Sequence, residues 1–154
     1  MAASSALRSW QALSGTATGR WLFSRLVCLK APYFMSIRPV FERLEPGRAA
    51  ARFRKRRAVT NHIGTVHAIA MANLCELVAG TVTEVSVPSS MRWIPRSMRI
   101  DYLGKAESGV RAEALFPDLG AEKTQDVVVP VNVVDGSGRP VVRAEITMYL
   151  SPRK

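Results

Sequence analysis

The polar residues best suited to chemistry lie in one short stretch of the chain. Asn61, His67, Asn73 and Glu76 fall within sixteen positions, and the residues around Glu76 are mostly Ala, Leu, Met and Val. A carboxylate costs free energy to bury in its ionised form unless a partner compensates the charge. Carboxylates in such surroundings are candidates for functional sites, so Glu76 is the first residue to explain.

Two structural explanations compete with a functional one. Glu76 could accept hydrogen bonds from buried backbone or from Asn73, three residues earlier, or it could emerge at a subunit boundary. His67 could be a capping or packing residue, which is the usual role of a histidine near the start of a helix. Neither residue type decides the function by itself.

Residues 65–80 predict the one strong helix, because Ala, Met, Leu and Glu dominate them and Gly80 stands where a left-handed cap would end it. The segment is apolar nearly all round, which favours a central helix enclosed by a sheet. Nine residues separate His67 from Glu76, which corresponds to about 13 Å of helical rise and about half a turn. A site that uses both residues therefore needs a symmetric dimer with composite sites.

The start of this helix offers a second chemical group. Unpaired N–H groups near Ala68 and Ile69, together with the helix dipole, could polarise a carbonyl and stabilise an oxyanion. A carboxylate on the opposite side of that carbonyl could activate water or attack directly. Thioester hydrolysis requires this arrangement.

The remaining segments predict strands. Residues 37–45 and 49–56 predict a hairpin with a turn at 45–48, and four further strands are predicted at 96–104, 110–116, 126–134 and 141–150. Residues 135–138, Asp-Gly-Ser-Gly, predict the hairpin turn between the last two strands. Pro130 predicts a bulge or an edge position, because proline cannot donate to a strand ladder. The fold class is therefore α+β, with an antiparallel sheet wrapped around a long central apolar helix.

Length and charge limit the remaining possibilities. With 154 residues and 47% hydrophobic content, we expect one domain over residues 36–154 and an N-terminal helical extension over residues 1–35, broken at residues 15–19 and ended by Ala31-Pro32. Residues 1–41 contain five cations and no acid, so they are either an organelle transit peptide or an ordinary helical segment that docks on the domain.

Cysteine usage and hydropathy bear on location. Cys28 and Cys75 lack the spacing of a zinc site or a disulfide framework, which favours a reducing compartment. We expect a cytoplasmic protein, or a mitochondrial matrix protein if the N-terminus is a transit peptide. The most apolar stretch is interrupted by His67, Asn73 and Glu76, so a membrane span is not expected.

The stretch that contains these polar residues resembles a motif of a known superfamily. Asn61, Gly64, His67 and Glu76 resemble the Asn-x-x-Gly-x-x-His-Gly-Gly then Asp/Glu pattern of hotdog-fold acyl-CoA thioesterases of the phenylacetic-acid-pathway type. Residues 61–80, with Pro-Tyr-Phe at 32–34 and Arg-Trp-Ile-Pro at 92–95, resemble an uncharacterised hotdog family of bacterial proteins still more closely.

The resemblance implies a role for each matching residue. Glu76 would be the general base or nucleophile, Asn61 would position water or substrate, and His67 would order the loop whose Ala68 N–H contacts the oxyanion. It also implies a homodimer or a dimer of dimers that needs no metal and no cofactor beyond the coenzyme A thioester substrate. Ala68 and Ile69 depart from the pattern, because they replace two glycines, and we expect Ile69 to narrow the substrate pocket.

A basic strip precedes the helix, with six Arg and Lys residues between positions 48 and 57. It could hold the phosphates of coenzyme A, bind nucleic acid or be a solvated strand face. A nucleic-acid partner is not expected, because the strip lacks interleaved aromatics and a binding motif. Trp93 either lines an acyl pocket or packs in the core. The expected substrate-binding residues are Gly64, Ile69, Asn73, Trp93, Arg56, Arg57 and Arg96.

The leading hypothesis is therefore an acyl-CoA thioesterase-like protein that hydrolyses an acyl thioester. The alternative is a noncatalytic protein of the same fold that binds acyl-CoA or an acyl-carrier thioester, which the loss of the glycine pair favours. A dehydratase of the same fold is a third possibility.

Overall fold

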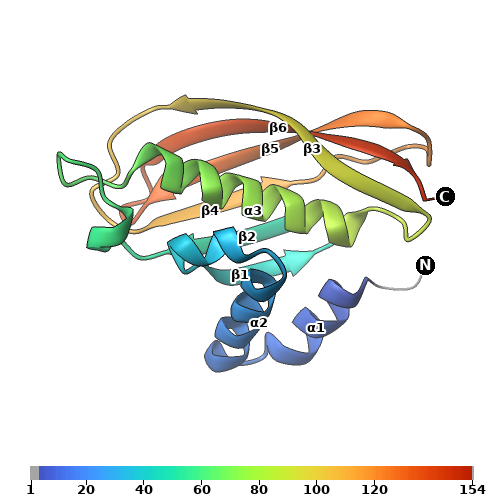
Figure 1. Ribbon diagram of the computed structural model, residues 1–154, viewed down its shortest axis with the longest axis horizontal. Coiled ribbons are helices and arrows are strands. Elements are labelled where there is room, and N and C mark those ends of the chain that lie inside the picture. Colours follow the sequence, from blue (N-terminus) through green and yellow to red (C-terminus); the bar gives the residue numbers. More distant parts are fainter. Residues whose placement is uncertain (1–3, 154) are drawn as a thin grey trace.

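The structure is a computed structural model that describes residues 4–153. A six-stranded antiparallel sheet curves around one long helix, and two shorter helices and a 3-10 segment lie beside the sheet (Figure 1). The elements in chain order are α1 (Ser5–Leu13), α2 (Ala17–Lys30), η1 (Pro32–Ile37), β1 (Val40–Glu45), β2 (Arg48–Phe53), η2 (Arg57–Val59), α3 (Ala68–Ser86), β3 (Met91–Tyr102), β4 (Val110–Leu115), β5 (Gln125–Asp135) and β6 (Pro140–Pro152). This confirms the predicted order of strand, strand, helix and four strands.

The sheet has the order β1-β2-β4-β5-β6-β3, with every neighbouring pair antiparallel. Its inner face carries alternating buried residues such as Val129, Val131 and Val133, which pack against α3. By length and composition α3 could cross a membrane, but 67% of it is buried inside the fold. It is the core helix of the sheet.

Helix α3 differs at both ends from the helix predicted over residues 65–80. It begins at Ala68 and continues through Gly80 to Ser86. The prediction that Gly80 caps the helix is wrong. A Cβ at this position would lie 3.1 Å from the Trp93 ring, so glycine is needed here for the close approach of a strand side chain and not for a left-handed turn.

The strands also begin and end at different residues from those predicted. β3 starts at Met91 and not at residue 96, so Trp93 and Pro95 belong to the strand. Pro130 lies in β5, an internal strand of the sheet, and the ladder with β6 has no bulge at this residue, so the predicted bulge is wrong. The ladder between β4 and β5 ends at the pair Ala114 and Val131. Pro130 therefore lies just beyond the end of this ladder and has no paired residue on the β4 side, a local edge position that proline tolerates.

The predicted turn between β5 and β6 is confirmed. Gly138 has a φ of 83°, and the Asp135 carboxylate accepts hydrogen bonds from the Ser137 N–H, the Ser137 hydroxyl and the Arg139 N–H. These bonds hold the pKa of Asp135 below its ordinary value, with the Ser137 hydroxyl as the largest cause.

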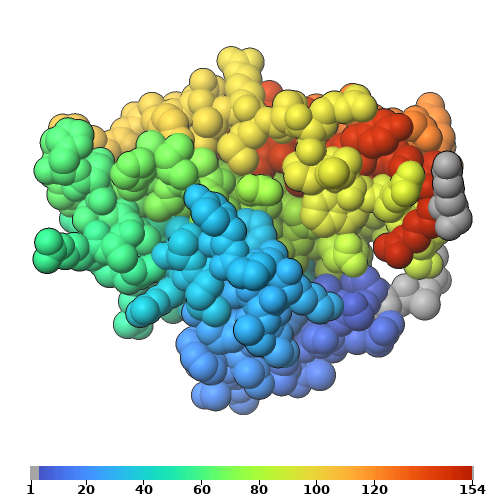
Figure 2. Space-filling view, viewed as in Figure 1, coloured from blue at the N-terminus to red at the C-terminus, as the bar shows by residue number. Residues whose placement is uncertain are grey.

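The N-terminal segment is helical and docks on the domain. The predicted break lies between α1 and α2, where Thr16 caps α2. Trp10, Phe23 and Phe41 form a cluster of edge-on aromatic pairs with centroids 5.1 to 6.4 Å apart. The strand predicted from residue 37 begins at Val40, because Ile37 is the last residue of η1. In Figure 2 the helices form a lobe directly against η1. Helices α1 and α2 thus share the buried core.

Candidate functional site

The start of α3 is organised by His67. Its Nδ1 accepts the Ile69 N–H at 3.0 Å, and its carbonyl accepts the N–H groups of Ala70 and Met71. Within residues 4–153, the Ala68 N–H is then the one amide of the first turn without an acceptor. His67 is therefore the N-cap, and the single free amide is the one expected to contact an oxyanion.

The preceding loop is held by Asn61. Its Oδ1 accepts from the N–H groups of Ile63 and Thr65, and its Nδ2 donates to the Thr65 hydroxyl at 2.8 Å. Gly64 has a φ of 79°, which favours glycine at this turn. The Asn61 side chain is thus used within the loop, and its predicted contact with water or substrate stays a prediction.

Glu76 lies half-buried on α3, about 13 Å along the helix from His67. Its carboxylate makes no hydrogen bond or ion pair with the described residues. Asn73 does not satisfy it, because the Asn73 Nδ2 donates to the Ser36 hydroxyl at 3.0 Å. The explanation that buried backbone or Asn73 satisfies this carboxylate is therefore wrong, whereas its position at a subunit boundary stays a prediction.

A mainly apolar cavity of about 300 Å³ opens beside Glu76, and we call it the Glu76 pocket. Its walls come from α1, α2, η1, α3, β3 and β6, so the N-terminal helices close one side of it. Trp93 lines this cavity and also packs against the core, its Nε1 donates to Glu84 at 2.8 Å, and its contact with an acyl group stays a prediction. The lining residues are Ser5, Ala6, Val27, Lys30, Ala31, Phe34, Glu76, Leu77, Gly80, Thr81, Glu84, Trp93, Pro95 and Met148.

A second cavity of about 160 Å³ lies at the beginning of α3, and we call it the helix-start pocket. His67, Ile69 and Asn73 line it together with residues of η1 and η2. The Asn73 Oδ1 is buried and has no donor among residues 4–153. Two of the predicted substrate-binding residues, Ile69 and Asn73, therefore meet His67 at one pocket, while Glu76 belongs to the other.

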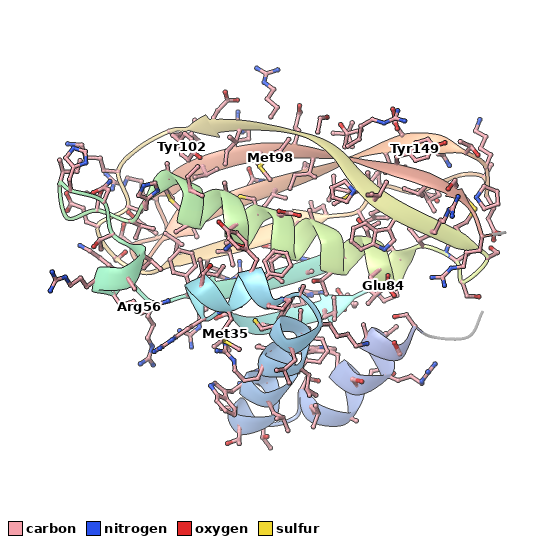
Figure 3. All side chains as sticks on the ribbon, in the orientation of Figure 1. Met35, Arg56, Glu84, Met98, Tyr102 and Tyr149 are labelled. Atoms are coloured by element: carbon pink, nitrogen blue, oxygen red, sulfur yellow. The ribbon has the colours of Figure 1, made fainter. Side chains whose placement is uncertain are left out.

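The predicted arginines are not brought together. Arg56 donates to the Ser36 carbonyl and lies near η1 (Figure 3), whereas Arg57 is exposed in η2. Arg96 pairs with Asp126 at 2.7 Å and lies over the Tyr149 ring, on the face of the sheet opposite α3. Among residues 4–153, no group of three or more His, Cys, Asp and Glu side chains is placed to hold a metal ion.

Two residues near the site were missed by sequence reasoning. Glu84 follows Glu76 at a spacing of i+8 with Gly80 between them, so the helical period could have identified it as a second carboxylate of the same face. Tyr102 donates its hydroxyl to the Ala68 carbonyl at 3.1 Å. Figure 3 shows Tyr102 and Met98 on β3 above the first half of α3, a contact that no local pattern indicates.

The comparisons with known proteins agree on the fold. A family model described as "Domain of unknown function (DUF4442)" matches residues 19–150, whereas no curated protein matches the chain. A protein whose crystal structure is described as "genomics APC5556" is 45% identical, with a TM-score of 0.84 over 96% of this chain and 98% of the other.

Two more distant structures carry functional names. A Pseudomonas aeruginosa protein of unknown function, described as a probable thioesterase, is 22% identical, with a TM-score of 0.76 over 84% of this chain and 93% of its own. A thioesterase family protein from Silicibacter pomeroyi is 16% identical, with a TM-score of 0.73 over 84% of this chain and 96% of its own. The chain therefore has the hotdog fold of thioesterase-like proteins.

Proposed function

Because the chain belongs to the family described as "Domain of unknown function (DUF4442)" and has the fold of thioesterase-like proteins, we propose that it hydrolyses acyl thioesters of coenzyme A. The observation that carries this proposal is Glu76, a carboxylate with no partner among the described residues that opens into an apolar pocket. In the proposed reaction it accepts a proton from water, whose oxygen attacks the thioester carbonyl carbon. The carbon–sulfur bond then breaks, and the thiolate leaves and is protonated.

The Ala68 N–H supplies the second group in the proposal. It points from the positive end of a 19-residue helix, where a free amide and the helix dipole favour the negative oxygen of the tetrahedral intermediate. Since Ala68 and Glu76 are separated along one helix, we propose that each site combines Glu76 of one protomer with Ala68 of the partner subunit.

The edge strand β3 supports this dimer. It ends the strand order of the sheet, so one side of its backbone lacks a neighbouring strand within the described chain. Ile94 and Leu103 are 61% and 50% exposed, and Met98 and Tyr102 are also exposed. A long edge with apolar side chains favours pairing with a second copy. Pairing of two β3 strands around a twofold axis would set the two α3 helices side by side in opposite directions.

Thiol release from a panel of short, long and aromatic acyl-CoA thioesters tests the catalytic proposal. Glu76→Gln is expected to lower kcat at least 100-fold, the usual contribution of a positioned base. Glu145→Gln is the matched control, because Glu145 is exposed on the sheet face opposite α3. Full turnover by Glu76→Gln would refute the mechanism.

Mixed dimers test the composite site. Ala68→Pro removes the free N–H at a helix position that proline tolerates, and His67 already has the extended backbone, with ψ of 137°, that a following proline requires. A mixture of Glu76→Gln and Ala68→Pro subunits should regain about a quarter of the wild-type activity, since half of the dimers then hold one intact site. No recovery in confirmed mixed dimers would refute the composite arrangement.

One observation favours the noncatalytic alternative, an acyl-CoA or acyl-carrier-binding protein. Ile69 is 56% exposed at the helix-start pocket, and its N–H is already bonded to His67. Only one amide is then free for an oxyanion. Tight acyl-CoA binding without turnover of any substrate would establish this alternative.

A further inference from the structure

We propose that the cavity between α2 and the β1–β2 hairpin binds the phosphate groups of a nucleotide. This cavity, which we call the arginine cavity, measures about 690 Å³ and is separate from the Glu76 pocket. Among its described lining residues five are arginines and one is acidic. These six are Arg20, Arg38, Arg52, Arg54, Arg56 and Glu42.

The positive charge of the arginine cavity is not neutralised within the chain. The Glu42 carboxylate is shared between Arg52 and Arg111, with each N–O distance 2.7 Å. The side chains of Arg38 and Arg54 have no hydrogen bond or ion pair with any residue from 4 to 153. A concave site with unpaired guanidinium groups concentrates anions, and a phosphate accepts paired hydrogen bonds from such groups.

Two local features distinguish the arginines of this cavity. Arg38 has a φ of 49°, and it is the one non-glycine residue with positive φ in the described chain. Strained backbone of this kind clusters at ligand sites. Arg56 is fixed by its bond to the Ser36 carbonyl, while its Nε is buried without an acceptor among the described residues. One N–H of this guanidinium therefore lacks an acceptor among the described residues.

The wall of the arginine cavity also suits a base. Trp21 lines it and is 51% exposed. The Arg25 guanidinium lies over one face of its ring, and the other face is the one on which we propose that a purine or pyrimidine stacks. The volume falls in the range of small-molecule sites. A phosphate cluster beside an aromatic surface matches a nucleotide with two or more phosphates better than it matches a lone inorganic anion.

The nucleotide can come from two sources. One is the nucleotide end of coenzyme A, which carries a 3′-phosphate and a diphosphate, and this source rests on the proposed function. Ile37 lines both the arginine cavity and the helix-start pocket, so the two are adjacent. The other source is a separate nucleotide that binds independently of any thioester.

Calorimetric titration with coenzyme A, 3′,5′-ADP, ATP and inorganic phosphate tests the site. The double variant Arg38→Asn with Arg54→Gln removes two charges, and asparagine tolerates the positive φ at residue 38. It is expected to weaken nucleotide binding at least tenfold. Arg143→Ala, which removes an exposed arginine on the sheet face opposite α3, is the matched control and should bind like the wild type.

The outcomes distinguish coenzyme A from a separate nucleotide, and they distinguish the nucleotide-binding proposal from the catalytic proposal. Tight binding of coenzyme A and 3′,5′-ADP, lost in the double variant, supports the first source, and binding of ATP without coenzyme A supports the second. Absence of nucleotide binding, an unchanged double variant, or binding of inorganic phosphate as tight as that of the nucleotides overturns the proposal. Hydrolysis of an acyl-N-acetylcysteamine thioester, which has no nucleotide, reports on the catalytic proposal independently.

Discussion

Replacing Trp10 by alanine tests whether the N-terminal helices belong to the folded core. The Trp10 side chain is 7% exposed, and its ring meets Phe23 at 5.1 Å and Phe41 at 6.4 Å. Truncating a buried tryptophan costs about 3–5 kcal/mol, which includes edge-on aromatic pairs of about 0.5–1.5 kcal/mol each. We therefore expect Trp10→Ala to lower the free energy of unfolding by about 4 kcal/mol.

Urea denaturation followed by circular dichroism measures this loss. With a slope of about 2 kcal/mol per molar urea, the midpoint should fall by about 2 M. Trp21→Ala is the control on the neighbouring helix, because Trp21 is 51% exposed and packs against Arg25, a contact of about 0.5–1 kcal/mol. A loss below about 1.5 kcal/mol for Trp10→Ala, or equal losses for both variants, would refute the reasoning.

Two substitutions and one labelling experiment test other parts of the structure. Asn61→Ala removes the acceptor of two loop N–H groups and the donor to Thr65, and should lower unfolding free energy by about 2 kcal/mol in the same assay. Asp135 has a depressed pKa in the folded state, so its stabilisation is present at neutral pH and is lost as pH falls through that pKa. Asp135→Asn should therefore lose less stability than the wild type between about pH 6 and about pH 3. Burial raises the pKa of the Cys75 thiol to about 12 and also raises that of Cys28. A disulfide reagent should label neither thiol in the folded protein at neutral pH and both in urea, and rapid labelling of folded Cys75 would contradict its burial.

Local sequence patterns predict most of the elements correctly. The apolar run around Leu74 and Val78 predicts a buried helix, and the valine-rich segments predict β5 and β6, because side-chain periodicity and β-branching act within a few residues. Thr16 at the start of α2 and the turn at Asp135 are also local features. Each depends on hydrogen bonds between residues no more than four apart.

Predictions that depend on contacts across the fold are wrong or incomplete. Gly80 has the residue type of a helix cap, but Trp93 of β3 occupies the space beside it and the helix continues. Pro130 has the residue type of an edge position, and although β5 is internal, its ladder with β4 ends at the adjacent pair, Ala114 and Val131. A side chain distant in sequence decided the first case, and the length of a ladder between two strands decided the second.

The sequence by itself determined the chemistry that is present: a carboxylate in an apolar helix, a histidine at its start and a surplus of arginine. The tertiary structure decided where these groups lie. It placed Glu76 in a pocket closed by α1 and α2, set Arg96 on the opposite face of the sheet, and gathered Arg38 and Arg54 with Arg20 of α2 around one cavity. Spacing along a chain fixes relations within one element, whereas pockets form between elements whose packing depends on the whole core.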